Sequence, residues 1–98
     1  MDFKIIWTDP AIEGLREIVQ SIAADNQPAA QRVGLELVER MEITNQFPRL
    51  GPLYSQEGAI EIRCLTHGNY RLYYRLGQVP RHVEVVAVRH SARDQPTF

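Results

Sequence analysis

Apolar residues recur with a helical period after a short β-prone run at residues 3–7. The apolar positions of this first stretch are Ile12, Leu15, Ile18, Val19, Ile22 and Ala23. Asp9 is expected to cap the helix with its carboxylate, and Pro10 suits the first helical turn, where no backbone N–H is needed. The spacing therefore predicts an amphipathic helix that ends at about Ala24.

A second helical stripe begins after the proline-containing turn at residues 25–28. It consists of Ala30, Val33, Leu37, Val38 and Met41. Leu35 lies off this stripe, so we expect it either to widen the buried face or to contact a partner protein. Two consecutive helices joined by a short turn should pack as an antiparallel hairpin. The two prolines and the glycine of residues 47–52 end the helical pattern, and a loop is expected up to Gly58.

The remaining chain alternates with the two-residue period of β-strands. The apolar or small positions of two predicted strands are Ile60, Ile62, Cys64 and Thr66, then Tyr70, Leu72, Tyr74 and Leu76. The short turn at residues 67–69 joins them as a hairpin. We expect these positions to pack on the helices. The opposite face would then carry Arg63, Arg71, Tyr73 and Arg75.

A further strand is predicted at His82–Val88, apolar on both sides as an interior strand would be. The element order is then β-α-α-β-β-β. This order implies an α+β two-layer domain, with a helical hairpin on one face of a mainly antiparallel four-stranded sheet. A length of 98 residues is typical of one domain, here residues 1–98.

Composition restricts the chemistry available to the chain. It has one cysteine and no Cys/His cluster, so we expect neither a disulfide, a metal site nor another cofactor. No apolar run approaches the roughly 20 residues that span a bilayer, and the first residues do not read as a secretory signal. We therefore expect no membrane association and a cytoplasmic location.

The charge is distributed unevenly although the net charge is only −1. Residues 1–59 hold 5 basic and 9 acidic residues, a net charge of −4. Residues 60–98 hold 6 basic and 3 acidic residues, a net charge of +3. The asymmetry indicates an acidic helical half and an arginine-rich sheet half, each able to serve as a separate surface.

Five segments, in this order and spacing, resemble the RelE/ParE toxins of type II toxin–antitoxin systems. They are Trp7-Thr8-Asp9-Pro10-Ala11, Phe47-Pro48-Arg49-Leu50-Gly51, Ile62-Arg63-Cys64-Leu65, Tyr70-Arg71-Leu72-Tyr73-Tyr74-Arg75, and Val85-Val86-Ala87-Val88-Arg89-His90-Ser91-Ala92-Arg93-Asp94. The second and the last are most similar to the ParE and plasmid-stabilisation branch.

This resemblance implies one of two activities. RelE-like members are ribosome-dependent endoribonucleases that cut mRNA, whereas ParE-like members inhibit DNA gyrase. In both branches a cognate antitoxin neutralises the toxin, wraps over its helices and sheet, and alone contacts operator DNA. A third alternative is a degenerate member that binds antitoxin but poisons nothing.

Catalytic positions of the ribonuclease branch are only partly present. Arg63, Arg71 and Arg93 match its basic positions, and His90 offers an acid or base near neutral pH. However, Glu61 stands where a lysine is expected, and no tyrosine follows Tyr74. These departures favour a ParE-like gyrase inhibitor without catalytic residues, and leave the enzyme as the alternative.

Under the preferred interpretation the same side chains serve binding. The residues expected to contact the target or the antitoxin are Arg63, Arg71, Tyr73, Arg75, Arg93 and Leu35. The simpler alternative is a solvated strand face, on which the arginines pair with carboxylates such as Glu61 or Glu84 on neighbouring strands.

Overall fold

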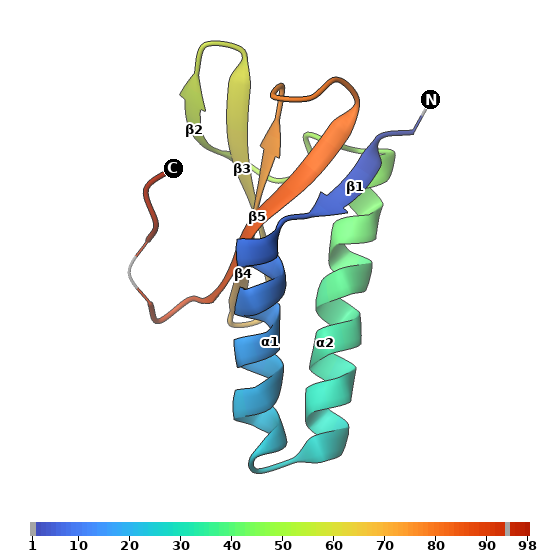
Figure 1. Ribbon diagram of the computed structural model, residues 1–98, viewed down its shortest axis with the longest axis vertical. Helices are drawn as coiled ribbons and strands as arrows, with labels where there is room; N and C mark the ends of the chain where they lie inside the picture. Colours follow the sequence, from blue (N-terminus) through green and yellow to red (C-terminus); the bar gives the residue numbers. More distant parts are fainter. Residues whose placement is uncertain (1, 94) are drawn as a thin grey trace.

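The chain folds into a five-stranded sheet with two helices packed on one face (Figure 1). The structure is a computed structural model, and it describes residues 2–93 and 95–98. In chain order the elements are β1 (Lys4–Trp7), α1 (Asp9–Ala23), α2 (Gln27–Glu42), a 3-10 turn (Ile43–Asn45), β2 (Leu53–Glu57), β3 (Ile60–His67), β4 (Tyr70–Leu76) and β5 (His82–His90). The predicted α+β class and the helical hairpin are confirmed.

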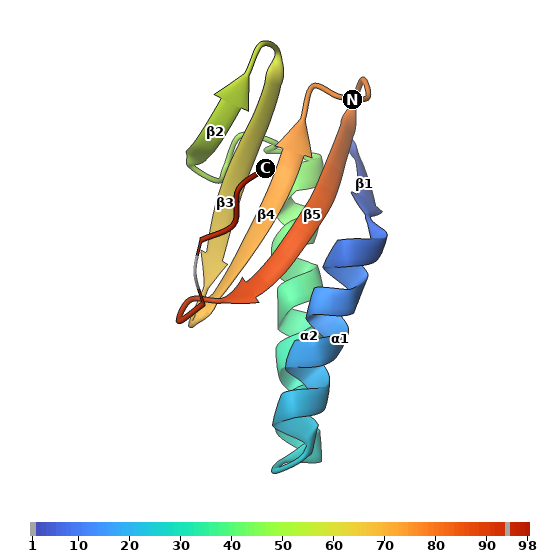
Figure 2. The same ribbon diagram turned by 60° about the vertical axis from the view of Figure 1, so that its left-hand side comes forward.

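The order of strands across the sheet is β1-β5-β4-β3-β2. The pairs from β2 to β5 are antiparallel, whereas β1 runs parallel to β5, with Lys4 opposite His82 and Trp7 opposite Val85. A parallel pair needs a crossover connection, and the helical hairpin is part of it. The far ends of the helices project beyond the sheet (Figures 1 and 2).

The start of α1 differs from the prediction. Thr8, not Asp9, is the N-cap residue, and no side chain caps the helix. The Thr8 hydroxyl instead donates to the carbonyl oxygen of Val85 at 2.7 Å, and its backbone N–H donates to the same oxygen at 3.1 Å. These two bonds attach the beginning of α1 to β5. A side-chain cap is present at the start of α2, where the Asn26 side chain accepts a hydrogen bond from the backbone N–H of Ala29.

The four-stranded sheet was a wrong prediction, because residues 53–57 form β2 and not a loop. β2 pairs with β3 at the edge of the sheet, with a register irregularity between Leu53 and Ser55. Both ends of the strand are exposed. An edge strand held mainly by backbone hydrogen bonds has no need of apolar alternation, so its sequence carries little signal.

The apolar positions of β3 were assigned to the wrong face. Leu65 is buried in the main core beneath the helices, whereas Ile62 and Cys64 pack in a second cluster on the opposite face of the sheet. The main core otherwise follows the prediction for β4. Its buried members are Ala11, Leu37, Met41, Leu65, Leu72, Tyr74, Leu76, Val83, Val85 and Val88.

A close approach between α1 and β5 depends on a glycine. A Cβ added to Gly14 would lie 2.7 Å from the carbonyl oxygen of Val88, a backbone atom that cannot move aside alone. Gly34 in α2 differs, because an added Cβ would meet only the side-chain Cγ2 of Val19, at 3.1 Å. The short distance between α1 and β5 therefore requires glycine at position 14, whereas position 34 in α2 does not require it.

We predict that Gly14→Ala lowers the free energy of unfolding by about 1–3 kcal/mol, because the added methyl group overpacks the contact with β5. Gly34→Ala is the matched control and should be neutral or stabilising by up to about 1 kcal/mol, the usual helix preference for alanine. Urea denaturation of both variants measures this. Equal effects of the two substitutions would contradict the close approach.

Candidate functional site

The face of the sheet away from the helices, called here the open face, carries most of the predicted binding side chains. Arg71, Tyr73 and Arg75 alternate along β4 with side chains that pack in the main core, so all three belong to the open face. Tyr73 is a member of the second apolar cluster, together with Ile62 and Ala87. The open face is therefore partly apolar and partly basic.

Arg63 does not share this face, which corrects the prediction. It pairs in register with Tyr74, whose side chain lies in the main core, so Arg63 projects toward the helical side. Its guanidinium donates to Glu61 Oε1 at 2.8 Å and to the Gly51 carbonyl oxygen at 2.9 Å. Only 16% of the side chain is exposed. The reason is that Leu65 of β3 is buried on the helical side of the sheet. Arg63 is two residues before Leu65 in the same strand, so its side chain projects to the same side.

Arg63 belongs to a network that fixes the segment 47–52. Glu61 also accepts from Arg49 Nη2 at 3.1 Å, and the Gly51 N–H donates to the Tyr74 hydroxyl oxygen at 2.9 Å. The hydrogen bond from Arg63, with a further contribution from Arg49, holds the pKa of Glu61 below its ordinary value. Burial raises the pKa of Tyr74, and the Gly51 bond acts against that rise.

Arg75 is compensated by a carboxylate on the adjacent strand. Its guanidinium donates from Nε to Glu84 Oε1 at 3.0 Å and from Nη2 to Oε2 at 3.2 Å. The two residues are opposite each other in β4 and β5. For Arg75, the structure therefore agrees with the alternative in which an arginine of the strand face pairs with a carboxylate on a neighbouring strand.

Arg71 has a different environment. Its partner across β4 and β5 is Arg89, and its partner on β3 is Thr66. Among residues 2–93 and 95–98, no carboxylate forms an ion pair with Arg71 or Arg89. Like charges directly opposite each other destabilise a strand pair. Sequence reasoning missed Arg89, since only the register with β4 places it beside Arg71.

Tyr73 is covered and not available on the surface. Only 1% of the residue is exposed, and its ring contacts Tyr54 of β2 and Phe98, with centroid distances of 4.9 Å and 5.4 Å. The Tyr54 hydroxyl donates to the carbonyl oxygen of Pro96. Burial raises the pKa of Tyr73, and the neighbouring Arg71 guanidinium acts against that rise. The segment 95–98 thus lies over part of the open face (Figure 2).

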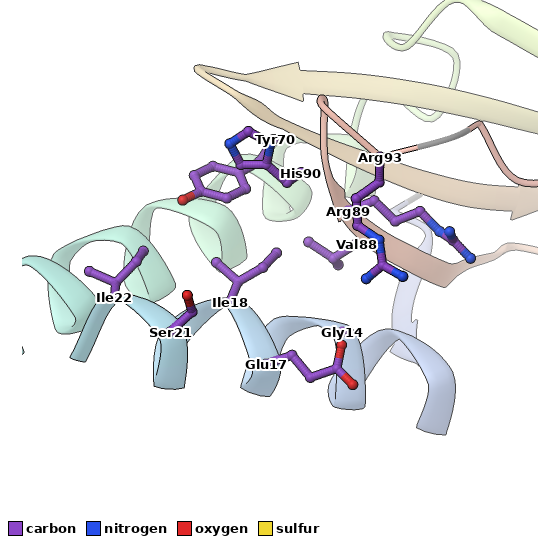
Figure 3. A pocket seen from close by; sticks show the side chains of 10 residues that line it. All are labelled: Gly14, Glu17, Ile18, Ser21, Ile22, Tyr70, Val88, Arg89, His90 and Arg93. Carbon is purple, nitrogen blue, oxygen red and sulfur yellow. The ribbon is translucent and has the colours of Figure 1, made fainter. Parts of the chain in front are cut away.

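A groove runs between α1 and β5, and Figure 3 shows one end of it. It comprises two hollows of about 260 Å³ and 680 Å³ that share five lining residues, namely Gly14, Glu17, Val88, Arg89 and Arg93. Arg89 and Arg93 come from β5 and the segment after it, and Glu17 from α1 (Figure 3). The groove is therefore basic on the sheet side and acidic on the helix side.

His90 has a structural environment at one end of this groove. Its ring packs edge-on against Tyr70, with centroids 5.4 Å apart. Its Nδ1 accepts from the backbone N–H of Ala92 at 3.0 Å, and its carbonyl oxygen accepts from Arg93 N–H at 3.0 Å. These two contacts order the turn that positions Arg93.

Leu35 lies in the helical layer, on the other side of the sheet from Arg71. It belongs to α2 and is 61% exposed. It does not widen the buried face, and its contact with a partner stays a prediction. Phe47 and Leu50 of the segment 47–52 are also large, apolar and exposed. The predicted binding residues thus occupy two surfaces, the open face with the adjoining groove and the helical layer.

Two classes of site were searched for across residues 2–93 and 95–98. In that part of the chain no three His, Cys, Asp or Glu side chains converge as metal ligands would. None of its helices has the length and apolar character that crossing a bilayer requires.

Comparison with solved structures identifies the fold. A chain of a chromosomal ParDE TA system from P. aeruginosa matches with a TM-score of 0.73 and 17% sequence identity, and the match covers 90% of this chain and 95% of that one. A chain of the RelBE2 toxin–antitoxin complex from Mycobacterium tuberculosis matches with a TM-score of 0.65 and 20% sequence identity. This match covers 92% of this chain and 99% of that one. A chain of the archaeal RelE–RelB complex from Pyrococcus horikoshii OT3 matches with a TM-score of 0.67 and 12% sequence identity. This match covers 96% of this chain and 100% of that one. This chain therefore shares the fold of these three chains.

The family follows from the sequence. Residues 5–95 match the model of the ParE toxin of type II toxin–antitoxin systems, parDE. No curated protein matches this chain. The chain belongs to the ParE toxin family, as the order of the five motifs from Trp7 to Asp94 predicted.

We predict that Arg63→Ala lowers the free energy of unfolding by about 1–3 kcal/mol, because it removes charge-assisted bonds to Glu61 and Gly51. Arg71→Ala should change it by less than about 0.5 kcal/mol, since Arg71 forms no ion pair among residues 2–93 and 95–98. Thermal and urea denaturation of the two variants measure the difference. Equal stability loss would show that Arg71 also supports the fold.

The Glu61 network predicts a pH dependence. Because folding lowers the pKa of Glu61 from about 4.5, its stabilising contribution is complete above pH 4.5 and is lost as pH falls through the lower folded-state pKa. Glu61→Gln should therefore be less stable than wild type at pH 7, with a gap that narrows toward pH 3. Urea titrations of both proteins at several pH values test this, and a gap independent of pH would contradict it.

Proposed function

We propose that this chain is the toxin of a toxin–antitoxin pair, that it acts on DNA gyrase, and that a cognate antitoxin neutralises it. Membership of the ParE family supports the gyrase target over the ribosome. The charge pattern supports the same choice, because a chain with a net charge of −1 is unlike a general nucleic-acid binder.

The position of Arg63 carries this proposal. Cleavage of RNA requires several cationic side chains to converge on one phosphate and on the 2′-hydroxyl that attacks it. Arg63 and Arg71 project to opposite faces of the sheet, and Arg63 is engaged by Glu61 and by the Gly51 carbonyl oxygen. The three-arginine site expected of a ribonuclease is therefore not assembled around these residues.

Two further observations favour a non-enzymatic toxin. Glu61 occupies the position of an expected lysine, and it is committed to Arg49 and Arg63. The sequence has no tyrosine after Tyr74 to complete the nuclease constellation. His90 lines the same hollow as Arg93, and its Nδ1 is engaged by a backbone N–H.

The antitoxin is proposed from the neighbours and from the exposed surfaces. The Mycobacterium tuberculosis and Pyrococcus horikoshii structures are toxin–antitoxin complexes. In this chain the exposed Leu35 offers an apolar anchor on the helical layer, and the groove beside α1 offers a second contact region. An amphipathic antitoxin segment fits such a combination. Operator DNA is then contacted by the antitoxin, and the toxin joins that complex through it.

Supercoiling by purified gyrase tests the target. We predict that the isolated toxin inhibits ATP-dependent supercoiling of a relaxed plasmid, and that Arg71→Ala or Arg89→Gln weakens inhibition at least severalfold without unfolding the protein. Arg16→Ala is the matched control, because Arg16 is an exposed arginine of α1 that pairs with Glu13 on the same helix and lines neither hollow of the groove. Undiminished supercoiling at saturating folded toxin would reject gyrase as the target.

The second candidate is an mRNA endoribonuclease, and one observation favours it. Arg71, Arg89 and Arg93 form no ion pair in the described part of the chain, and Arg89 and Arg93 line the same groove. Pulse-labelling of protein synthesis minutes after induction of the toxin separates the two. Continued labelling with cell filamentation supports gyrase, whereas immediate loss of labelling supports mRNA cleavage. Growth without either response supports the third alternative, a degenerate member of the family that binds antitoxin but poisons nothing.

A further inference from the structure

One hollow of the groove between α1 and β5 combines an apolar lining with charges of both signs (Figure 3). This hollow of about 260 Å³ is called here the smaller hollow. Its large apolar side chains are Ile18 and Ile22 of α1 and Val88 of β5. Sites for drug-sized ligands have volumes of about 300–1,000 Å³, and they are mostly apolar with a few polar groups. The smaller hollow has this character, and its volume suits a molecule below drug size.

The charged groups of the smaller hollow are not paired with one another. Glu17 extends from α1, whereas Arg89 and Arg93 come from β5 and the turn after it (Figure 3). Neither arginine has a guanidinium nitrogen within 4.0 Å of the Glu17 carboxylate. Within residues 2–93 and 95–98, none of the three forms an ion pair with any other side chain. Opposite charges that share a hollow without meeting leave room for a molecule that bridges them.

Neighbouring charges do not take this bridging position. Glu13 and Arg75 line the larger hollow, but each has a partner outside it. Glu13 pairs with Arg16 at 2.7 Å, and Arg75 pairs with Glu84 at 3.0 Å. Arg71 lines neither hollow. The smaller hollow thus differs from the rest of the groove, because its own three charges are the ones without partners in the described chain.

The signs of these charges select the kind of ligand. A simple anion is attracted by Arg89 and Arg93 but repelled by Glu17, and a simple amine meets the opposite combination. Repulsion of this kind discriminates between ligands as effectively as attraction does. A molecule with one positive and one negative group satisfies both walls of the hollow. Ser21 and Tyr70 add two hydroxyl groups to the lining, which are able to donate to a carboxylate oxygen.

We propose that the smaller hollow binds the zwitterion of a free apolar α-amino acid. The ammonium group pairs with Glu17 on the helix side, and the carboxylate lies between Arg89 and Arg93 on the sheet side. The apolar side chain of the ligand packs on Ile18 and Val88. Because the ammonium and carboxylate groups of an α-amino acid are attached to the same carbon, one compact head group connects charges that the protein holds apart. This site is independent of gyrase and of antitoxin.

An NMR titration of the full chain with L-leucine tests the proposal, and it uses neither gyrase nor antitoxin, so its failure is distinct from failure of the proposed function. Shift changes should centre on the residues that line the smaller hollow. Three probes each lack one part of L-leucine. They are 4-methylpentanoate without the ammonium group, L-leucine methyl ester without the carboxylate, and glycine without the apolar side chain. Each should bind about tenfold more weakly, the worth of one charged hydrogen bond or one buried apolar side chain.

Two variants remove the charges one at a time. Glu17→Gln should weaken binding of L-leucine about tenfold, because the ammonium group loses its partner. The same substitution should leave binding of 4-methylpentanoate equal or tighter, because it removes a repulsion. Loss of the fold would weaken both ligands, so this opposite response separates recognition from a structural effect. Arg93→Gln should weaken L-leucine and 4-methylpentanoate alike.

The matched controls are Glu39→Gln and Arg32→Gln. Both residues belong to α2, and neither lines the groove. The two control variants should bind L-leucine with the affinity of the wild type. An equal loss of affinity in the controls and in Glu17→Gln or Arg93→Gln would mean that general charge, and not the hollow, governs binding.

Four other outcomes would overturn the proposal. Binding of 4-methylpentanoate as tight as that of L-leucine would make the hollow a plain anion site. Equal binding of the methyl ester would remove the role of the two arginines, and equal binding of glycine would remove that of the apolar lining. Absence of shift changes up to the solubility limit of L-leucine would remove the site.

Discussion

Two adjacent tyrosines on opposite faces of β4 organise the structure. Tyr74 is fully buried beneath the helices, and its hydroxyl accepts from Gly51, so it fixes the segment that Arg63 and Glu61 also bind. Tyr73 is buried on the open face, where it supports Tyr54 and the segment 95–98. A strand with large side chains on both faces needs cover on both, and the helices supply only one of them.

A bulge makes this double burial possible. Tyr73 pairs with Ala87 and Tyr74 pairs with Val85, which leaves Val86 as an extra residue in β5. A bulge shifts the alternation of the strand that contains it. As a result Val85 and Val88 both face the helices although they are three positions apart, while Val86 and Ala87 serve the second cluster. The apolar run of β5 is thus divided between two layers.

The arginines divide in a similar way between structure and function. Arg49, Arg63 and Arg75 each have a carboxylate within 3.1 Å, and Arg63 also holds backbone carbonyls. Arg71, Arg89 and Arg93 lie toward one end of the sheet and the adjoining groove, without such partners in the described chain. Arg89 and Arg93 share that groove with Glu17 of α1. Net charge alone conceals this arrangement, because it averages over paired and unpaired groups.

Sequence alone determined the helical hairpin, four of the five strands and the family, because these depend on local periodicity, turn residues and motif order. The side chains of β4 were also assigned correctly, since regular alternation around a short turn leaves one solution. Only the tertiary structure decided the face of Arg63, the pairing of β2, the position of Arg89 opposite Arg71 and the burial of Tyr73. Each of these depends on register between strands distant in sequence, and a shift of one residue moves a side chain to the other face. Both faces of this sheet bury apolar groups, so the hydrophobic pattern of β3 was unable to select between them.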